Sequence, residues 1–85
     1  MYRIRTYPEA RDAVAALPAA ALVGYAEARA VLALVPWNGR SINGANPDGA
    51  VRHLVFGPDA MGMVTYLILE RDRQVDVLEV QWLGE

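Results

Sequence analysis

The sequence predicts an α+β domain in which two helices cover one face of a mostly antiparallel sheet. A short strand of alternating apolar and charged residues, Tyr2 to Tyr7, opens the chain. Two alanine-rich helical stretches and a polar loop follow, and three strands rich in β-branched and aromatic residues come last. Because a sheet with one apolar face is stabilised by helices packed on that face, this order of elements favours a two-layer fold.

We expect a single domain over residues 1–85, since a chain of this length supports one modest hydrophobic core. Apolar residues make up 54% of the sequence, which is ample for that core. Cysteine is absent and there is one histidine, so we expect no disulfide, no metal site and no cofactor. The longest uncharged stretch, Ala13 to Ala26, is too short to span a bilayer, and no export signal is recognisable. These features are compatible with the bacterial cytoplasm.

Local signals predict where the two helices begin and end. Thr6 and Glu9 have the spacing of a capping box, with Pro8 at the first helical position, so the first helix is expected to begin there. Pro18 ends it, and the second helix runs from about Ala19 to Val35. The residues at helical spacing that predict the buried stripe of the first helix are Ala10, Ala13, Val14 and Leu17. The small residues that predict close packing of the second helix are Ala26, Ala30 and Ala33.

A polar segment with three asparagine-containing turn motifs runs from Pro36 to Gly49. A loop this long in a small domain is usually functional or mobile. Three strands are expected after it, at Val51 to Phe56, Met63 to Glu70 and Gln74 to Trp82, with a charged hairpin tip between the last two. The residues expected to be largely buried are Leu17, Val64, Ile68, Leu78 and Val80.

Five segments in order resemble the RelE/ParE toxin superfamily over nearly the whole chain. They are the opening strand with Pro8-Glu9-Ala10, the Leu17-Pro18 break, the strand that contains Arg52, the run Val64-Thr65-Tyr66-Leu67-Ile68, and Val75-Asp76-Val77-Leu78-Glu79-Val80. The resemblance implies a RelE/ParE-like fold and the toxin of a bacterial type II toxin–antitoxin system. Such toxins are ribosome-dependent messenger-RNA endoribonucleases, which inhibit translation, or gyrase poisons. It also implies a cognate antitoxin lying across the toxin surface, with the ribosome and its messenger RNA as further partners.

The catalytic positions of the ribonucleolytic branch are only partly filled in this sequence. That branch commonly has an arginine three positions before the tyrosine of the middle strand, where this chain has Met63. Near the end of the last strand it has His, Tyr or Arg, where this chain has Trp82. Arg52 matches an arginine that is common on the first strand after the helices. The resemblance therefore implies endoribonuclease activity that is weak or altered.

Cleavage of RNA by acid–base catalysis needs a base for the 2′-hydroxyl, an acid for the leaving 5′-oxygen and cations on the phosphate. The predicted catalytic residues are Arg52, Arg40 in the glycine-rich loop, and His53, the one imidazole. We expect activity to depend on the two arginines more than on His53. The alternative to a phosphate-binding role for Arg52 is an ion pair with Glu79. His53 shares its strand face with Val51 and Val55, so the alternative for His53 is a structural role.

Arg3, Arg5 and Trp37 are the predicted RNA-binding residues. The two arginines would join Arg40 and Arg52 in a local basic patch, and Trp37 would either stack on a base or cover the core. The net charge of −2 lacks the basic excess of most nucleic-acid-binding domains. Bidentate arginine–carboxylate pairs suit the acidic tail of an antitoxin equally well.

Two functions of different classes stay open on the sequence. One is a RelE/ParE-like toxin bound to its antitoxin, and the other is a catalytically silent module that keeps the same fold for protein interaction. Growth of cells on induction separates them. A small-molecule-binding α+β domain is a third alternative, although no cluster of convergent polar groups supports it.

Overall fold

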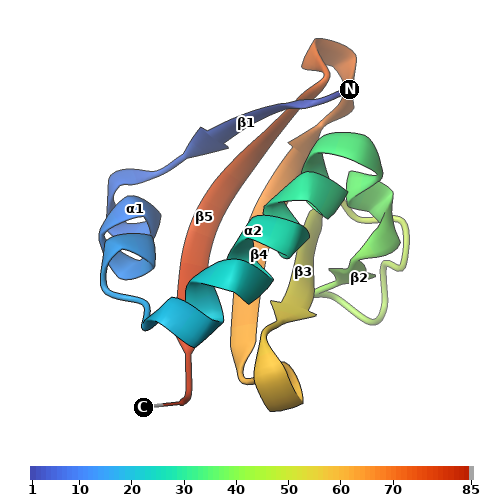
Figure 1. The fold of residues 1–85 in the computed structure, drawn as a ribbon. Helices are drawn as coiled ribbons and strands as arrows, with labels where there is room; N and C mark the ends of the chain where they lie inside the picture. The colour runs from blue at the N-terminus through green and yellow to red at the C-terminus, as the bar shows by residue number, and fades with distance from the viewer. Residues whose placement is uncertain (85) are drawn as a thin grey trace.

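The computed structural model describes residues 1–84 and has the two layers expected from the sequence (Figure 1). The chain begins with β1 (Arg3–Thr6) and continues through α1 (Pro8–Ala15) and α2 (Ala19–Leu34). The later strands are β2 (Arg40–Ser41), β3 (Val51–Phe56), β4 (Gly62–Leu69) and β5 (Gln74–Trp82). Short 3-10 turns occur at η1 (Pro36–Asn38), η2 (Pro58–Ala60) and η3 (Glu70–Asp72).

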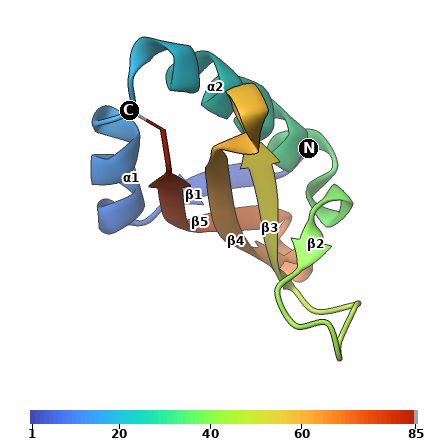
Figure 2. The same ribbon diagram turned by 90° about the horizontal axis from the view of Figure 1, so that it is seen from below.

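All five strands form one mixed sheet in the order β1-β5-β4-β3-β2. β1 runs parallel to β5, and every other neighbouring pair is antiparallel. Both helices lie on one side of this sheet, and in the part of the chain that the structure describes no helix covers the other side (Figure 2). We call that other side the uncovered face. The α+β class predicted from the sequence is therefore confirmed, with β1 as a member of the sheet. No helix within residues 1–84 is long and apolar enough to cross a membrane.

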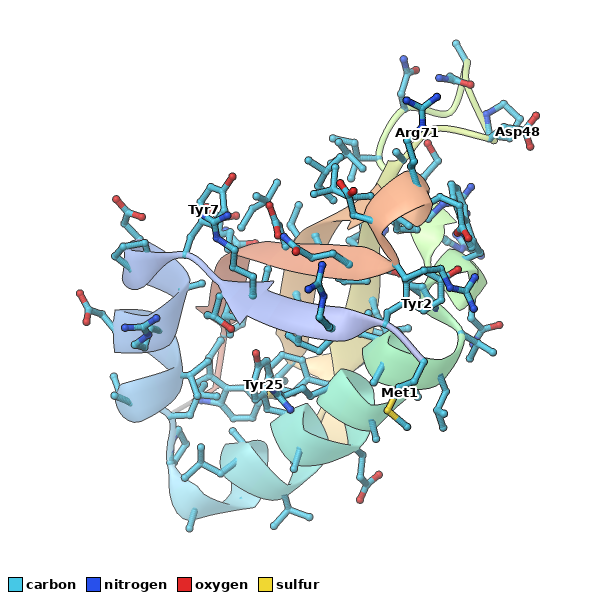
Figure 3. All side chains as sticks on the ribbon, turned by 90° about the horizontal axis from the view of Figure 1, so that it is seen from above. Met1, Tyr2, Tyr7, Tyr25, Asp48 and Arg71 are labelled. Carbon is cyan, nitrogen blue, oxygen red and sulfur yellow. The ribbon has the colours of Figure 1, made fainter. Side chains whose placement is uncertain are left out.

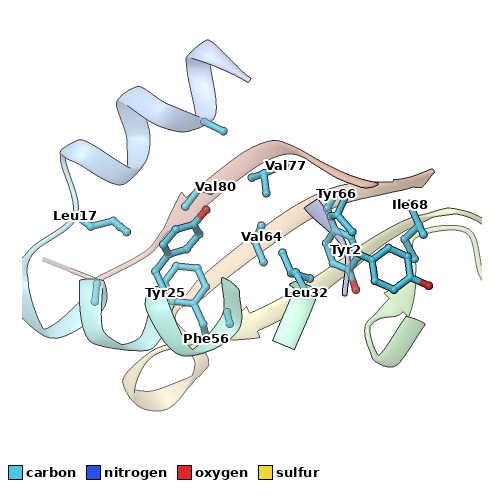
Figure 4. Packing of buried hydrophobic residues seen from close by; sticks show 14 residues of the cluster. Tyr2, Leu17, Tyr25, Leu32, Phe56, Val64, Tyr66, Ile68, Val77 and Val80 are labelled. Atoms are coloured by element: carbon cyan, nitrogen blue, oxygen red, sulfur yellow. The ribbon is translucent and has the colours of Figure 1, made fainter. Parts of the chain in front are cut away.

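The core lies between α2 and the sheet (Figure 4). The buried residues of α2 are Ala21, Tyr25, Ala28 and Leu32, which recur at helical spacing. Tyr25 meets Phe56 edge to face, with ring centroids 5.6 Å apart. The close-packed face predicted for α2 was wrong, because Ala26 and Ala30 are exposed. Turning Tyr25 and Leu32 inward removes more apolar area from water than turning alanines inward would.

Proline sets both helix starts, but the predicted capping box is not formed. The N-cap of α1 is Tyr7 and has no side-chain cap, and Pro8 occupies the first helical position. Thr6 is still in β1, where it pairs with Val77, so its hydroxyl group does not cap the helix. α2 ends at Leu34, one residue earlier than predicted, shortly before Pro36.

A β-bulge in β5 changes which of its residues face the core. Thr65 of β4 lies opposite Glu79 and the next residue, Tyr66, lies opposite Val77, so Leu78 has no partner across β4. Leu78 is only half-buried, which makes its predicted burial wrong. The other four residues expected in the core are buried as predicted: Leu17, Val64, Ile68 and Val80. The bulge also turns Glu79 towards the uncovered face.

The polar segment after α2 is more ordered than the sequence predicts. It contains β2, which pairs with β3 so that Arg40 lies opposite His53. The hydroxyl of Tyr66 donates a hydrogen bond of 2.6 Å to the carbonyl of Pro36, in the buried part of this segment. Gly39 allows this close approach, since a Cβ atom on it would lie 2.0 Å from the Tyr66 hydroxyl.

Candidate functional site

A row of four polar side chains crosses the uncovered face, one from each of four neighbouring strands. Arg40 lies opposite His53, His53 lies opposite Thr65, and Thr65 lies opposite Glu79. Each of these residues alternates with core-facing neighbours on its strand, so its side chain projects from the uncovered face. With neighbouring strands about 4.8 Å apart, the backbones of His53 and Glu79 are separated by roughly 10 Å. We call these four residues the polar row.

The polar row combines a guanidinium, an imidazole, a hydroxyl and a carboxylate. Arg40 and Glu79 are exposed, and His53 and Thr65 are half-buried. No ion pair within residues 1–84 involves any of them. An open pocket of about 450 Å³ lies at the Arg40 end, where Asn38, Arg40 and His53 belong to its wall. The short side chain of Thr65 leaves space between the imidazole and the carboxylate. Such a set contains an acid, a base and a cation on one accessible surface.

Arg52, the first predicted catalytic residue, faces the opposite side of the sheet. It lies opposite Tyr66, is 8% exposed, and is surrounded by backbone carbonyl groups. Its guanidinium donates to four carbonyl oxygens, those of Gly49 (3.0 Å), Gly39 (2.8 Å), Pro47 (2.8 Å) and Trp37 (3.3 Å). The segment from Trp37 to Gly49 is therefore tied to β3 by one side chain. The suggested ion pair between Arg52 and Glu79 was wrong, because the two side chains lie on opposite faces of the sheet.

Trp37 is held by two charged groups. The guanidinium of Arg52 lies 4.8 Å from the centre of its ring, and its indole N–H donates to Glu70 Oε1 at 2.7 Å. Glu70 also accepts hydrogen bonds from the Tyr2 hydroxyl and from Arg73, with the Arg73 Nη1 atom 2.9 Å from Oε2. The hydrogen bonds from Tyr2, Trp37 and Arg73 lower the pKa of Glu70 to about 2. The Trp37 ring is 40% exposed, and the stacking role predicted for it stays a prediction.

The strand order separates the arginines that were expected to form one patch. β1, which carries Arg3 and Arg5, is one edge of the sheet, and β2, which carries Arg40, is the other. Four strand spacings of about 4.8 Å place these edges roughly 19 Å apart. With Arg52 on the far side of the sheet, the predicted joint basic patch was wrong. The RNA contacts predicted for Arg3 and Arg5 themselves stay a prediction.

The two positions where the resemblance implied missing catalytic groups lie on different faces of the sheet. Met63 is on the uncovered face, opposite Val55 and Gln81. Trp82 packs on the helix side, where its ring stacks with that of Phe56 at 6.4 Å and an interplanar angle of 23°. The prediction of Trp82 as a core aromatic is in keeping with this contact.

Sequence reasoning missed Thr65 and Glu79 as possible site residues. Strict alternation along β5 places Glu79 on the same face as Val75 and Val77, which are both core residues. The bulge at Leu78 reverses that assignment for Glu79. A signal was present in the sequence, since a carboxylate is a poor core residue, but the partners across the sheet depend on register.

Comparison of the sequence with protein-family models and with curated proteins found no match. Comparison of the structure with solved structures found several similar chains, among them three that are all under 25% identical in sequence. A chain of the intact E. coli RelBE toxin–antitoxin complex has a TM-score of 0.80 at 10% identity, and all of both chains is covered. The isolated E. coli RelE toxin has a TM-score of 0.78 at 9% identity, with 100% of this chain and 87% of that chain covered.

The third similar structure is archaeal. The RelE–RelB complex from Pyrococcus horikoshii OT3 has a TM-score of 0.71 at 19% identity, over 99% of this chain and 97% of that chain. The RelE-like fold implied by the sequence is therefore confirmed over the full described chain. At these identities the likeness establishes the fold and leaves the activity to be argued from the side chains.

Proposed function

We propose that this protein is the toxin of a type II toxin–antitoxin pair and that it cleaves messenger RNA on the uncovered face of its sheet. Two of the similar structures are complexes: the E. coli RelBE toxin–antitoxin complex and the RelE–RelB complex from Pyrococcus horikoshii OT3. This supports an antitoxin as the partner. The single observation that carries the catalytic part is the polar row, from Arg40 to Glu79, on an accessible face.

The polar row has the groups that an internal transphosphorylation of RNA requires. Glu79 takes the proton of a 2′-hydroxyl group, and the resulting oxygen attacks the adjacent phosphorus atom. His53, on the other side of Thr65, gives a proton to the 5′-oxygen as the bond between phosphorus and that oxygen breaks. Arg40 stabilises the negative charge that builds up on the phosphate. The products are a 2′,3′-cyclic phosphate and a free 5′-hydroxyl group.

The charge of the protein indicates how the RNA reaches this face. The net charge is −2, and the polar row contains one arginine, Arg40, so affinity for free RNA in salt is low. We propose that the ribosome presents the messenger RNA to the polar row. Activity on free RNA is then weak.

The contacts of Arg52 and His53 favour a different ranking of the residues that contribute to cleavage from the one predicted from the sequence. His53 and Glu79 flank the space over Thr65, whereas the donors of Arg52 are directed to backbone carbonyl groups. Arg52 then acts by holding the segment that carries Arg40, as a positioning residue. We propose that loss of His53 lowers cleavage at least as much as loss of Arg40.

The test is translation-coupled cleavage of messenger RNA, together with growth inhibition, for four purified or induced variants. His53→Ala and Glu79→Gln should each lower the cleavage rate by about 10²–10⁴-fold, and Arg40→Ala by about 10²–10³-fold. Gln81→Ala is the matched control, because Gln81 is exposed on the same strand as Glu79 and lies opposite Met63. It should cleave like the wild type.

Two results would contradict the proposal in different ways. Cleavage at the wild-type rate by both His53→Ala and Glu79→Gln would show that the polar row does not take part in the reaction. A wild-type protein that neither cleaves ribosome-bound messenger RNA nor slows growth would support the catalytically silent interaction module instead.

A further inference from the structure

A second pocket lies on the helix side of the molecule, away from the polar row. It has a volume of about 560 Å³ and opens between β1, α1 and α2, which Figure 1 shows around it. Arg11 of α1 and Arg29 of α2 belong to its wall. We call it the helix-side pocket. Its two guanidinium groups come from different helices and are brought to one surface by the packing of those helices.

Helical spacing explains why both arginines border the pocket. Val14, three residues after Arg11, belongs to the same wall, and so does Tyr25, four residues before Arg29. Residues three or four apart lie on the same face of a helix. Each helix therefore presents one arginine and one apolar or aromatic residue to the pocket.

β1 contributes its helix-facing side chains to the pocket. Ile4 and Thr6 are half-buried and line the wall. Arg5 alternates with them and lies opposite Asp76, so its side chain is on the uncovered face and its main chain borders the pocket. The positive charge of the pocket is therefore the charge of the two helix arginines.

Neither of these two arginines has an acidic partner within residues 1–84. The ion pair in that part of the chain joins Arg73 to Glu70, in and beside η3. Glu27, the acidic residue of α2, lines a different pocket together with Leu54 of β3. Two cations on one concave surface repel each other and concentrate positive potential, so a bound anion is stabilised there.

Tyr25 adds a hydroxyl group to the same wall. The residue is 6% exposed, and its ring meets that of Phe56 in the core. Figure 3 shows Tyr25 on the helix side of β1, and Figure 4 shows its hydroxyl directed away from Phe56. This hydroxyl makes no hydrogen bond within residues 1–84. It is not among the polar atoms sealed from solvent without a partner, so it reaches solvent through the pocket.

The hydroxyl groups of the pocket are neutral donors. Burial raises the pKa of the Tyr25 hydroxyl, and the nearby charge of Arg29 opposes part of that rise. The group therefore keeps its proton near pH 7. Thr6 supplies a second hydroxyl, which can also donate. The pocket thus combines two guanidinium groups with two hydroxyl donors.

We propose that the helix-side pocket binds a small phosphate monoester. Its phosphate group has a charge of about −2 near pH 7 and three acceptor oxygen atoms, which match two cations and four donor groups. A guanidinium group holds two phosphate oxygens through paired hydrogen bonds. A carboxylate has a single charge and two oxygens, so it would leave donors unused. The organic part of the ligand packs on Ile4 and Val14, the apolar part of the wall.

A small monoester fits the surroundings better than an RNA strand does. Glu9 and Asp12, the acidic residues of α1, are exposed and do not belong to the pocket wall. An RNA strand carries a negative charge on every nucleotide, so the phosphates outside the pocket would be repelled by these carboxylates. A monoester places its whole charge inside the pocket.

This binding site goes beyond the proposed cleavage of RNA and does not depend on it. The pocket is on the helix side, whereas His53 and Glu79 are on the uncovered face. A ligand in the pocket does not contact the polar row. Binding is measured without a cleavage assay, so either proposal can fail while the other stands.

The test measures binding of adenosine 5′-monophosphate, ribose 5-phosphate and inorganic phosphate to the purified chain at constant ionic strength. Both esters should raise the melting temperature, because a ligand that binds only the folded state stabilises it. They should also shift the amide signals of Thr6, Val14 and Tyr25 in a 15N-labelled protein. Adenosine lacks the phosphate and should bind at least about tenfold more weakly than its monophosphate. Inorganic phosphate lacks the organic part and should bind more weakly than either ester.

Removal of one donor at a time identifies the contacts. Arg11→Gln and Arg29→Gln should each raise the dissociation constant for adenosine 5′-monophosphate by roughly tenfold or more, and Tyr25→Phe by roughly threefold to tenfold. Arg71→Gln is the matched control, since Arg71 is exposed in η3 and does not line the pocket. It should keep the wild-type affinity. Circular dichroism without ligand checks that each variant is folded.

Four outcomes would overturn the proposal. The first is that neither ester binds at millimolar concentration, and the second is equal affinity of Arg11→Gln, Arg29→Gln and Arg71→Gln. The third is inorganic phosphate that binds as tightly as the esters, which would remove the contact with the apolar wall. The fourth is a short RNA without a terminal phosphate that shifts the pocket signals at lower concentration than the esters do, which would make this a nucleic-acid contact.

Discussion

Replacing Arg52 by alanine should unfold this protein far more readily than replacing an exposed arginine. Arg52 is 8% exposed and donates hydrogen bonds to the carbonyl oxygens of four residues in the segment after α2. Its guanidinium also lies 4.8 Å from the centre of the Trp37 ring. Alanine removes all five contacts and leaves the carbonyl groups of the segment without their donor.

The loss in free energy of unfolding expected for Arg52→Ala depends on how deeply each of these contacts is buried. The bond to the Gly39 carbonyl is buried, and an unsatisfied buried group costs about 1–3 kcal/mol. The bonds to Trp37, Pro47 and Gly49 are part-buried, so water replaces them in part, at about 0.5–1.5 kcal/mol each. The contact with the Trp37 ring contributes about 0.5–1 kcal/mol. Because neighbouring contacts are not additive, we expect a loss of roughly 3–5 kcal/mol. A domain of this size has a free energy of unfolding of roughly 4–13 kcal/mol in total.

Urea denaturation of the wild type, Arg52→Ala and Arg71→Ala measures this loss. Arg71 is exposed in η3, so its replacement should change the free energy of unfolding by less than about 0.5 kcal/mol. Hydrogen exchange should show faster exchange of the amides between Trp37 and Gly49 in Arg52→Ala. A change below about 1 kcal/mol in Arg52→Ala, accompanied by loss of RNA cleavage, would refute this reasoning. Arg52 would then act on the phosphate directly, as first predicted from the sequence.

Three further predictions concern the same part of the fold and its neighbour Glu70. Gly39→Ala should destabilise the protein by more than about 2 kcal/mol in urea denaturation, because the added Cβ atom would lie 2.0 Å from the Tyr66 hydroxyl. Gly44→Ala is the control and should be nearly neutral, since a Cβ atom on Gly44 would have nothing within 4 Å. Equal stability of the two variants would contradict this prediction. Tyr66→Phe should cost about 1–3 kcal/mol in thermal unfolding, since the buried carbonyl of Pro36 loses its donor; an unchanged melting temperature would argue against that bond. Glu70 has a pKa of about 2 in the folded protein, below its usual 4.5, so its contribution to stability is present above about pH 4.5 and is lost as the pH falls towards 2. Glu70→Gln should therefore show a weaker dependence of stability on pH in that range, and identical acid-unfolding curves would count against the hydrogen-bonded carboxylate.

Local chemistry explains which parts of the fold could be predicted. Prolines lack the backbone N–H that continues a helix, so Pro18 and Pro36 place the helix boundaries to within a residue or two. Runs of β-branched residues bounded by turn residues place β3 and β5 at the ranges predicted, Val51–Phe56 and Gln74–Trp82. Both signals act between residues close in the chain, so they can be recognised without knowledge of the fold.

Which residues of a strand face the helices was harder to predict. In β3, for example, apolar residues lie on both faces of the strand. Leu54 and Phe56 face the helices together with Arg52, while Val55 lies on the uncovered face with His53. Alternation groups Arg52 with Leu54 and His53 with Val55, but it does not say which group is inside. Packing of α2 against the sheet decides this, and it turns the predicted catalytic arginine away from the other site candidates.

The order and type of the elements, and the RelE-like architecture that they imply, were determined by the sequence alone. The strand order, the pairing of β2 and the bulge at Leu78 were decided by the tertiary structure. They depend on contacts between residues far apart in the chain, and a one-residue change of register turns every side chain to the opposite face. For that reason only the folded chain brings Glu79 into a row with His53 and Arg40, and separates Arg40 from Arg3 by the width of the sheet.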